Sequence, residues 1–565
     1  MKVWSPLSEK VELVVDSGIL PMTRDGHGWW SAAEKIPAGM RYRFRVDGKG
    51  PFPDPRSAWQ PEGAHGPSAV VDHSAFAWRD ADFVAKPLSD AVIYELHVGT
   101  FTPEGSYAAA AGRLGYLADL GITHVELMPV ATFPGDRGWG YDGVSIYAPH
   151  PAYGTPDELK AFVQLAHDLG LAVLLDVVYN HLGPDGNYLG AFAPYFTDRV
   201  KTPWGDAVNF DGEHSDEVRA FFVDNALMWM RDYHFDGLRL DAVHAIFDQS
   251  ATHVLELLAE RVAELSAISN RKLVLIAESD FNTPRLVQSA AIGGYGLDAH
   301  WEDDFHHALH AFLTGERGGY HADFGALAQL AKSLEQAYVF DGQYSAFRKR
   351  GHGRPPLHVA PSQIVVFTQN HDQTGNRALG ERTGHLLERE SLKAAATLML
   401  LSPFVPMLFQ GEEWGAGTPF LYFTDHHEEL GRLVTEGRRR EFASFGWSGT
   451  EVPDPQARET FERSKLCWSE LDAPGHGEIL AWHRALVALR RAIPPETPAE
   501  IRFSESEKWL SLRRGDLLAL FNFSDEPRSV PVDEGEWTVC LSSGVGAEIS
   551  ALPAKATVVA KRIAS

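Results

Sequence analysis

The chain has 565 residues, enough for about three or four domains, or fewer if one of them is a large barrel. Its net charge of −25, from 51 Lys and Arg against 76 Asp and Glu, argues against nucleic acid and anionic membranes as partners. A cytoplasmic, reducing setting is predicted because the chain has only two cysteines, no apolar signal segment at its start, and no run near the roughly 18 apolar residues of a membrane span.

A small β-sandwich is predicted for residues 1–86. Short alternating runs such as KVELVV and RYRFRVDG, separated by Gly and Pro, are typical of antiparallel strands. Similar patterns return in LLALFNFS and EWTVCLSS, so a second β-sandwich is predicted for residues 491–565.

The central part, residues 87–490, is predicted to be a (β/α)8 barrel with a short insertion at about 182–214. Eight short apolar runs fit buried parallel strands, and helical patterns lie between most of them. The runs are AVIYELHV, THVELMPV, LAVLLDVV, DGLRLDAV, KLVLIAES, GLDAHW, QIVVFTQN and VPMLFQG.

One of the predicted helices carries clear end signals. In TPDELKAFVQLAHDLG, Thr155 is expected to be the N-cap, Glu158 completes a capping box, and Gly170 ends the helix. The apolar face of this helix is expected to run from Leu159 to Leu169.

Polar side chains gather where the predicted barrel strands end. These residues are Asp176, Asn180 and His181 after the third strand, Arg239, Asp241 and His244 on the fourth, Glu278 after the fifth, and His371 and Asp372 after the seventh. The carboxyl ends of barrel strands share one rim, so these side chains are expected to converge. A single such residue is usually a cap or an ion pair, but this set is too large for structure alone.

The chemistry that fits this rim is glycoside hydrolysis, which needs one carboxylate to attack or activate water and one carboxylic acid to protonate the leaving oxygen. Asp241 suits the nucleophile because Arg239, two residues earlier on the same strand face, would hold it ionised. Glu278 follows the apolar run LVLIA, where desolvation would raise its pKa toward that of an acid. Asp372 would bind sugar hydroxyls, and His371 could donate a hydrogen bond, as could His181.

The segments DVVYNH, GLRLDAVH, IAES and QNHDQ resemble, in order and spacing, the four motifs of the α-amylase superfamily. Within it, RGWGYDGVSIYAP, KTPWGDAVNF and DDFHHALH look most like maltooligosyltrehalose trehalohydrolases. The resemblance implies a retaining cleavage of the α-1,4 bond beside a terminal trehalose, α-1,4-glucans as partners, no cofactor and a carbohydrate-binding-module-like first domain. It implies nucleophile, acid/base and stabiliser roles for Asp241, Glu278 and Asp372.

The resemblance also implies residues that touch the sugar. They are Tyr141, Asp176, His181, Arg239, His371 and Gln373. Trp204, in the insertion, is expected to cover the trehalose, although it could merely pack its loop. His244 could line the leaving-group side or cap the fourth strand.

Three further signals have plainer interpretations. Asn180 occupies a position that binds calcium in many amylases, but the insertion is short and we predict no metal. The histidines at 306, 307 and 310 could be metal ligands, and we expect partly exposed histidines on one helix instead. Arg438–Arg440 is expected to be a solvated helix face.

Two other functions stay open at this point. A glucan branching or debranching enzyme would share the architecture and the nucleophile and differ in its acceptor. A glucan-binding protein without activity would share the fold, but the intact trio of carboxylates argues against it.

Overall fold

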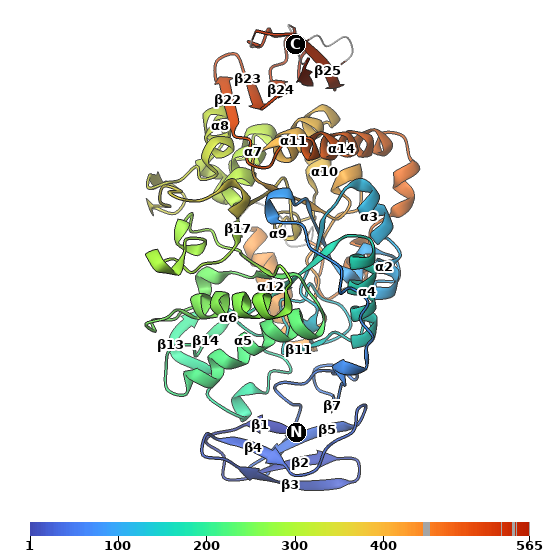
Figure 1. Ribbon diagram of the computed structural model, residues 1–565, viewed down its shortest axis with the longest axis vertical. Helices are drawn as coiled ribbons and strands as arrows, with labels where there is room; N and C mark the ends of the chain where they lie inside the picture. Colours follow the sequence, from blue (N-terminus) through green and yellow to red (C-terminus); the bar gives the residue numbers. More distant parts are fainter. Residues whose placement is uncertain (444–451, 533, 545–548, 550, 564–565) are drawn as a thin grey trace.

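The computed structural model describes residues 1–443, 452–532, 534–544, 549 and 551–563. Two β-rich domains lie at opposite ends of the long axis, and the barrel lies between them (Figure 1). The predicted (β/α)8 barrel with a β-rich domain on each side is therefore confirmed, with the amino-terminal domain at one end of the barrel and the carboxyl-terminal domain at the other.

Eight parallel strands close into the barrel in the order β12-β15-β16-β17-β20-β21-β8-β9. All eight predicted strands are present. They are β8 (Ile93–Leu96), β9 (His124–Leu127), β12 (Ala172–Val177), β15 (Gly237–Leu240), β16 (Val274–Ala277), β17 (Ala299–Trp301), β20 (Ile364–Phe367) and β21 (Val405–Phe409). Buried apolar side chains such as Ile93, Leu174, Ile276 and Val365 fill the interior, so the barrel is a packed core whose carboxyl rim remains for chemistry.

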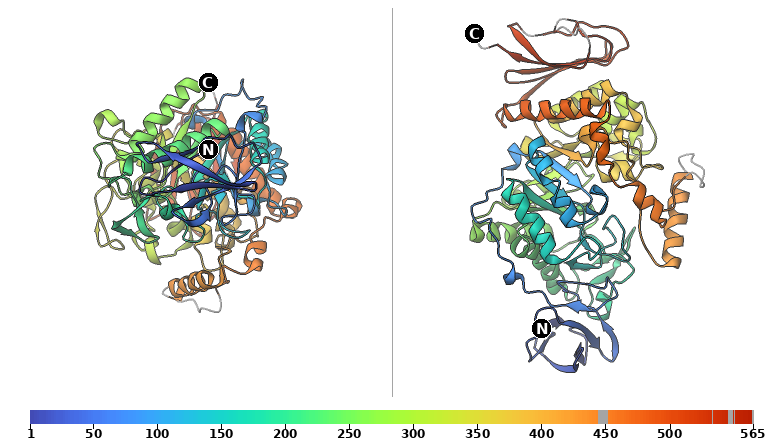
Figure 2. Two further views of the ribbon diagram at one scale, coloured as in Figure 1. Left: turned by 90° about the horizontal axis from the view of Figure 1, so that it is seen from below. Right: turned by 90° about the vertical axis from the view of Figure 1, so that its right-hand side faces the viewer.

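Helices surround the barrel, and along the chain they alternate with most of its strands (Figure 2). They are α1 (Val98–Phe101), α2 (Tyr107–Ala111), α3 (Leu114–Leu120), α4 (Pro156–Asp168), α5 (Ser215–Asp232), α6 (Val254–Ser269), α7 (Asp303–Thr314), α8 (Leu327–Gln336), α9 (His371–Gly375), α10 (Thr383–Leu386), α11 (Arg389–Leu401), α12 (Glu428–Ala443), α13 (Arg458–Arg463) and α14 (His476–Arg491). In two views, α12 stands apart from the ring of helices.

The predicted N-cap and capping box are both present at the start of α4. Thr155 accepts a hydrogen bond from the Glu158 backbone, and the Glu158 side chain accepts one from the Thr155 backbone, which completes the capping box. At the other end the helix stops at Asp168, so Leu169 is 39% exposed rather than part of the buried face. Gly170 follows with a φ of 78°, which suits a residue without a Cβ.

The amino-terminal domain is an antiparallel sheet in the order β1-β4-β3-β2-β5-β6, with β7 paired to β5. Its strands are β1 (Lys2–Trp4), β2 (Val11–Val15), β3 (Gly18–Arg24), β4 (Trp29–Ala32), β5 (Arg41–Val46), β6 (Lys49–Phe52) and β7 (Ser68–Ala69). Alternate residues of β2 and β5 are buried, as the period of two in the sequence predicts.

In its described residues, the carboxyl-terminal domain is one five-stranded antiparallel sheet, in the order β22-β23-β24-β26-β25. The strands are β22 (Ala499–Ser504), β23 (Trp509–Arg514), β24 (Leu517–Asn522), β25 (Trp537–Ser542) and β26 (Thr557–Arg562). A second sheet is expected for a sandwich. Here one face packs with the main core through Leu512 and Phe521, and loop residues such as Val530 and Leu552 cover the other.

Four further short strands lie in loops outside the barrel sheet. They are β10 (Ala131–Thr132), β11 (Ser145–Pro149), β13 (Phe196–Thr202) and β14 (Gly205–Val208). β13 and β14 pair as a hairpin within the predicted insertion and place Trp204 at its turn. A last pair, β18 (Tyr344–Ser345) and β19 (Arg350–Gly351), lies in the loop before β20.

Candidate active site

A buried arginine joins three carboxylates at the carboxyl rim. Nη1 of Arg239, on β15, lies 2.8 Å from the Asp176 carboxylate and 2.9 Å from that of Asp241, and Nη2 lies 3.6 Å from Glu278. The Trp301 ring covers the guanidinium at 4.3 Å. Parallel pairing of β12 with β15 sets Asp176 opposite Arg239, so the register itself brings the pair together. The sequence prediction that these strand ends converge is thus confirmed.

Asp241 is held by Asn180 as well as by Arg239. The Asn180 side-chain amide donates to Oδ2 of Asp241 at 2.7 Å and to its backbone carbonyl at 2.8 Å, while Oδ1 of Asn180 faces the His181 ring. Both carboxylate oxygens of Asp241 therefore have donors. Because the oxygen and the nitrogen of the amide are both engaged by protein groups, Asn180 does not fit the role of a calcium ligand.

Glu278 lies beside Asp241 in a different environment. Oε2 of Glu278 accepts a hydrogen bond from the Ala242 backbone at 2.5 Å. Ala242 has a φ of 39°, a left-handed conformation that is costly for a residue with a Cβ and that turns this N–H toward the carboxyl group. Burial raises the pKa of Glu278, and the Asp241 charge adds to the rise. The raised pKa suits Glu278 to carry a proton, whereas Asp241 has donors on both carboxylate oxygens.

A hydrogen-bonded chain extends from this pair to the first strand. The Tyr141 hydroxyl donates to Asp176 at 2.6 Å and contacts Nε2 of His371 at 2.7 Å, and the two rings stack. Nδ1 of His371 reaches the buried Glu95 carboxylate on β8. Burial alone would lower the pKa of His371, but the charges of Glu95 and Asp372 outweigh it and raise the pKa to about 9. His371 is therefore a cation at neutral pH.

Asp372 stands at the junction of two clefts, and its side chain is 45% exposed. One cleft, of about 650 Å³, contains the predicted residues Tyr141, His181, Trp204, Asp241, His244 and Glu278. The other, of about 710 Å³, contains Gln373, whose amide lies 3.3 Å from the Asp303 carboxylate. Asp372 and Asn376 line both clefts, so the clefts adjoin at these residues, and the two together are called the groove below.

The aromatic side chains predicted to touch sugar occupy the first cleft. Trp204 is 48% exposed and stacks on the His181 ring, with centroids 4.5 Å apart and an angle of 7°. The outer face of the indole is therefore open to a ligand. His244 lines this cleft and lies against Phe281 at 5.4 Å, and its Nδ1 has no hydrogen-bond partner among the described residues.

The histidines of α7 contradict the expectation of partial exposure, because His306, His307 and His310 are all buried and pack with His321. By spacing alone, two groups could hold a metal ion, since their candidate ligand atoms lie within 4.8 Å of one another. They are His306, His307 and His321, and His310, Glu316 and His321. Burial lowers the pKa of His307, as do His321 and Arg348. Spacing alone does not establish a metal site, so we assign none here.

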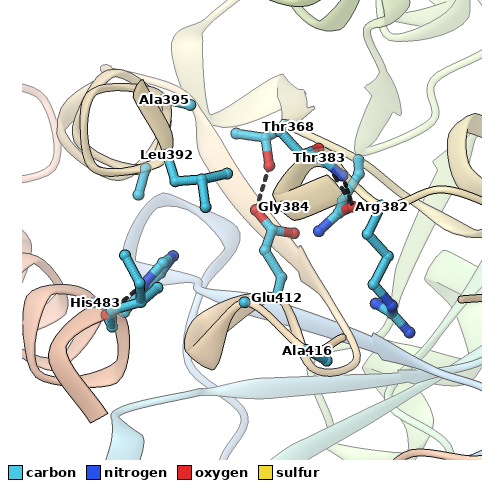
Figure 3. A pocket seen from close by; sticks show the side chains of 13 residues that line it. Thr368, Arg382, Thr383, Gly384, Leu392, Ala395, Glu412, Ala416 and His483 are labelled. Carbon is cyan, nitrogen blue, oxygen red and sulfur yellow. Dashed lines mark hydrogen bonds between the residues drawn. The ribbon is translucent and has the colours of Figure 1, made fainter. Parts of the chain in front are cut away.

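A further small cavity is separate from the groove (Figure 3). It has a volume of about 20 Å³ and lies beside Glu412, which accepts a hydrogen bond from the Thr368 hydroxyl. That volume holds about one water molecule and no sugar ring. This cavity is therefore not a candidate site for a sugar.

Two residues missed by the sequence analysis complete the site: Glu95 fixes His371, and Asp303 contacts Gln373. Asn180 was placed at the rim by the sequence, but its contact with Asp241 was not predicted. A carboxylate within the apolar run AVIYELHV was a usable signal for Glu95, because buried acids are rare unless they are paired.

Residues 80–195 match the family described as alpha amylase, catalytic domain, and residues 496–559 match a domain of unknown function (DUF3459). Together with the closed barrel and the carboxylates around Arg239, this defines a glycoside hydrolase of the α-amylase class.

The chain is also similar to named relatives. It is 50% identical to the malto-oligosyltrehalose trehalohydrolase of Arthrobacter ramosus, over 94% of each chain, and 46% identical to that of Mycobacterium tuberculosis (strain ATCC 25618 / H37Rv), over 96% of each. A crystal structure from Salmonella typhimurium, provisionally named an alpha amylase, is 38% identical, covers 100% of this chain and 97% of its own, and superposes with a TM-score of 0.92. The chain belongs to the malto-oligosyltrehalose trehalohydrolase family.

Proposed function

We propose that the chain hydrolyses the α-1,4-glucosidic bond next to the terminal trehalose of maltooligosyltrehalose, with retention, and releases trehalose. The observation that carries this proposal is the contrast between two adjoining carboxyl groups. Arg239 and Asn180 hold Asp241 with three hydrogen bonds or ion pairs, while burial raises the pKa of Glu278. A retaining glycosidase needs this pairing of an ionised nucleophile with a protonated acid.

The proposed reaction uses the chain's own groups at each step. Asp241 attacks the anomeric carbon while Glu278 gives its proton to the glycosidic oxygen, and trehalose leaves. Water then attacks the glucosyl-Asp241 ester, and Glu278 takes a proton from that water. Asp372 binds hydroxyls of the distorted sugar ring, and His371 can donate to a sugar hydroxyl only by exchanging the contact of its Nε2 with the Tyr141 hydroxyl.

The substrate is proposed to lie along the groove, with the bond to be cleaved near Asp372. The groove has two arms that meet there, so it can accept a chain on one side and a disaccharide on the other. An uncharged glucan suits a protein with a net charge of −25. We further propose domain boundaries at residues 86/87 and 490/491, and a reducing compartment for the free cysteines 467 and 540. Among the described helices, none has both the length and the apolar character of a membrane span.

Product identification tests the function. Incubation with a trehalose-capped maltooligosaccharide is expected to yield free trehalose and a maltooligosaccharide shortened by that unit. New α-1,6 branch points would identify the runner-up, a branching enzyme, and cleavage of α-1,6 bonds would identify a debranching enzyme. If no trehalose is released, the proposal is wrong.

Replacing Asn180 by alanine is expected to lower kcat by roughly ten- to a hundredfold, because a charge-assisted hydrogen bond to Asp241 contributes about 1.5–3 kcal/mol. KM should change little, since Asn180 contacts the nucleophile and not the substrate. Steady-state kinetics measure both constants, and a melting curve checks the fold. An unchanged kcat in a folded variant would contradict the role given to Asn180.

Dialysis against a chelator is expected to leave activity unchanged. Both the proton and the nucleophile come from carboxyl groups, and Asn180 does not fit calcium. Rates should be compared before dialysis, after it, and after separate addition of calcium and zinc. A loss that calcium restores would contradict the prediction for Asn180, and a loss that zinc restores would point to the histidines of α7.

Replacing Trp204 by alanine is expected to lower kcat/KM on trehalose-capped chains by roughly 1–3 kcal/mol of transition-state binding, because a stacking face is lost. Cleavage of plain maltooligosaccharides should fall less, so the preference should shrink. Competition between the two substrates in one reaction measures the preference directly. Equal losses on both would mean that Trp204 supports its hairpin and does not distinguish trehalose.

A further inference from the structure

Arg438 differs from its neighbours in the run at 438–440. Arg439 and Arg440 are exposed, as the sequence predicts, but the Arg438 side chain is only 15% exposed. Its guanidinium carbon lies 4.6 Å from the Tyr422 ring centroid and 4.9 Å from that of Phe442. Arg438 thus points from α12 toward the barrel, and the expectation of a solvated face is wrong for this residue.

The Arg438 guanidinium contacts the segment that carries Asp372. Nη2 donates to the Gly375 carbonyl at 3.0 Å, and Nη1 donates to Oδ1 of Asn376 at 3.0 Å. The Asn376 amide nitrogen in turn donates to Oδ1 of Asp372 at 3.1 Å. A continuous chain of hydrogen bonds therefore links a helix outside the barrel to a carboxylate at the centre of the groove.

This chain fixes which way the Asn376 amide faces. An amide offers an oxygen acceptor on one side and a nitrogen donor on the other. Because Arg438 has no acceptor, it can bind only the oxygen, and this leaves the nitrogen facing Asp372. One oxygen of the half-exposed Asp372 carboxylate is thereby engaged, and the other is left for sugar hydroxyls.

We infer that Arg438 is a positioning residue for the proposed reaction: it holds the Asp372 carboxylate, through Asn376, in the orientation that contacts the sugar in the transition state. The inference rests on the proposed function, in which Asp372 binds the distorted ring. The inference adds a residue of α12 to the site, and α12 lies outside the four sequence motifs quoted above.

A purely structural role for Arg438 makes a different prediction. Tyr422, Leu430 and Val434 line the first cleft, and Arg438 packs against Tyr422. If Arg438 only held α12 in place beside the cleft, its loss would weaken substrate binding and raise KM. If it orients Asp372, its loss affects mainly the transition state and lowers kcat.

The test compares Arg438→Met with Arg439→Met, a matched change one residue along the same helix on an exposed side chain. Arg438→Met is expected to lower kcat by roughly ten- to a hundredfold with KM changed less than about threefold, as for a small displacement of a catalytic group. Arg439→Met should match the unmodified enzyme. Arg438→Lys should recover part of kcat, because its ammonium can still donate to Asn376.

Asn376→Ala removes the middle of the chain without touching α12, so it remains informative if Arg438→Met fails to fold. The double variant should then be about as slow as Asn376→Ala alone, because the two residues act in series. Multiplicative losses in the double variant, or a raised KM with normal kcat in Arg438→Met, would overturn the inference. Trehalose release by the unmodified enzyme is measured in parallel, and its absence would refute the proposed function and not the positioning role specifically.

Discussion

Replacing Asp241 by alanine is expected to reduce kcat at least about a thousandfold, because covalent catalysis has no substitute for the attacking carboxylate. The barrel should still fold, since Asp176 and Glu278 remain beside Arg239 and the guanidinium keeps two partners. Turnover of a trehalose-capped maltooligosaccharide measures the loss, and circular dichroism measures the fold.

A substrate with a fluoride leaving group tests the loss of the nucleophile separately from the loss of the acid. Fluoride departs without a proton, so an α-maltooligosyl fluoride needs the nucleophile but not the acid. The Asp241→Ala variant should therefore release fluoride no faster than it cleaves the natural substrate. Rapid fluoride release by this variant would contradict the assignment of Asp241 as nucleophile.

Replacing Glu278 by glutamine is expected to cause a similar loss, at least about a thousandfold in kcat on the natural substrate, because the leaving oxygen is no longer protonated. With the fluoride substrate, the first step should recover and give a burst of about one fluoride per enzyme, followed by slow hydrolysis of the ester. Rapid-quench measurement of fluoride separates the two phases. If the variant shows no burst while Asp241→Ala does, the two roles are exchanged.

The pH profile provides a second check on Glu278. The acid must be protonated in the free enzyme, and its pKa is raised by burial, so kcat/KM should fall only as the pH rises through a value above the ordinary range of a glutamate. In Glu278→Gln this alkaline limb should be absent. An alkaline limb that persists unchanged would mean that another group is responsible for it.

The sequence allowed the barrel and the catalytic rim to be predicted because both depend on local patterns. Apolar runs mark the strands, and the parallel arrangement alone brings their carboxyl ends, with Asp176, Asp241, Glu278 and Asp372, to one rim. The capping box of α4 is local in the same way. These features need no knowledge of which distant segments meet.

The supporting contacts could not be predicted, because each joins elements far apart in the chain. Glu95 contacts His371 across 276 residues, and Arg438 contacts Asn376 across 62. One signal was present for Arg438: successive helical residues point about 100° apart, so three adjacent arginines span about 200° and the outer two lie nearest the packed face. Its partner, however, becomes apparent only from the tertiary structure.

The carboxylates gathered around Arg239 outnumber that cation, and their burial lowers the stability of the fold that holds them. Burial, with a contribution from the Asp241 charge, raises the pKa of Asp176 from 3.8 to about 7. An acid with a raised folded-state pKa binds its proton more tightly in the folded than in the unfolded chain, so the free energy of unfolding decreases as the pH rises through this range. Glu278, whose pKa is also raised, acts in the same direction. Glutamine at position 278 has no proton to lose, so Glu278→Gln is expected to remove the part of this pH-dependent loss of stability that comes from Glu278.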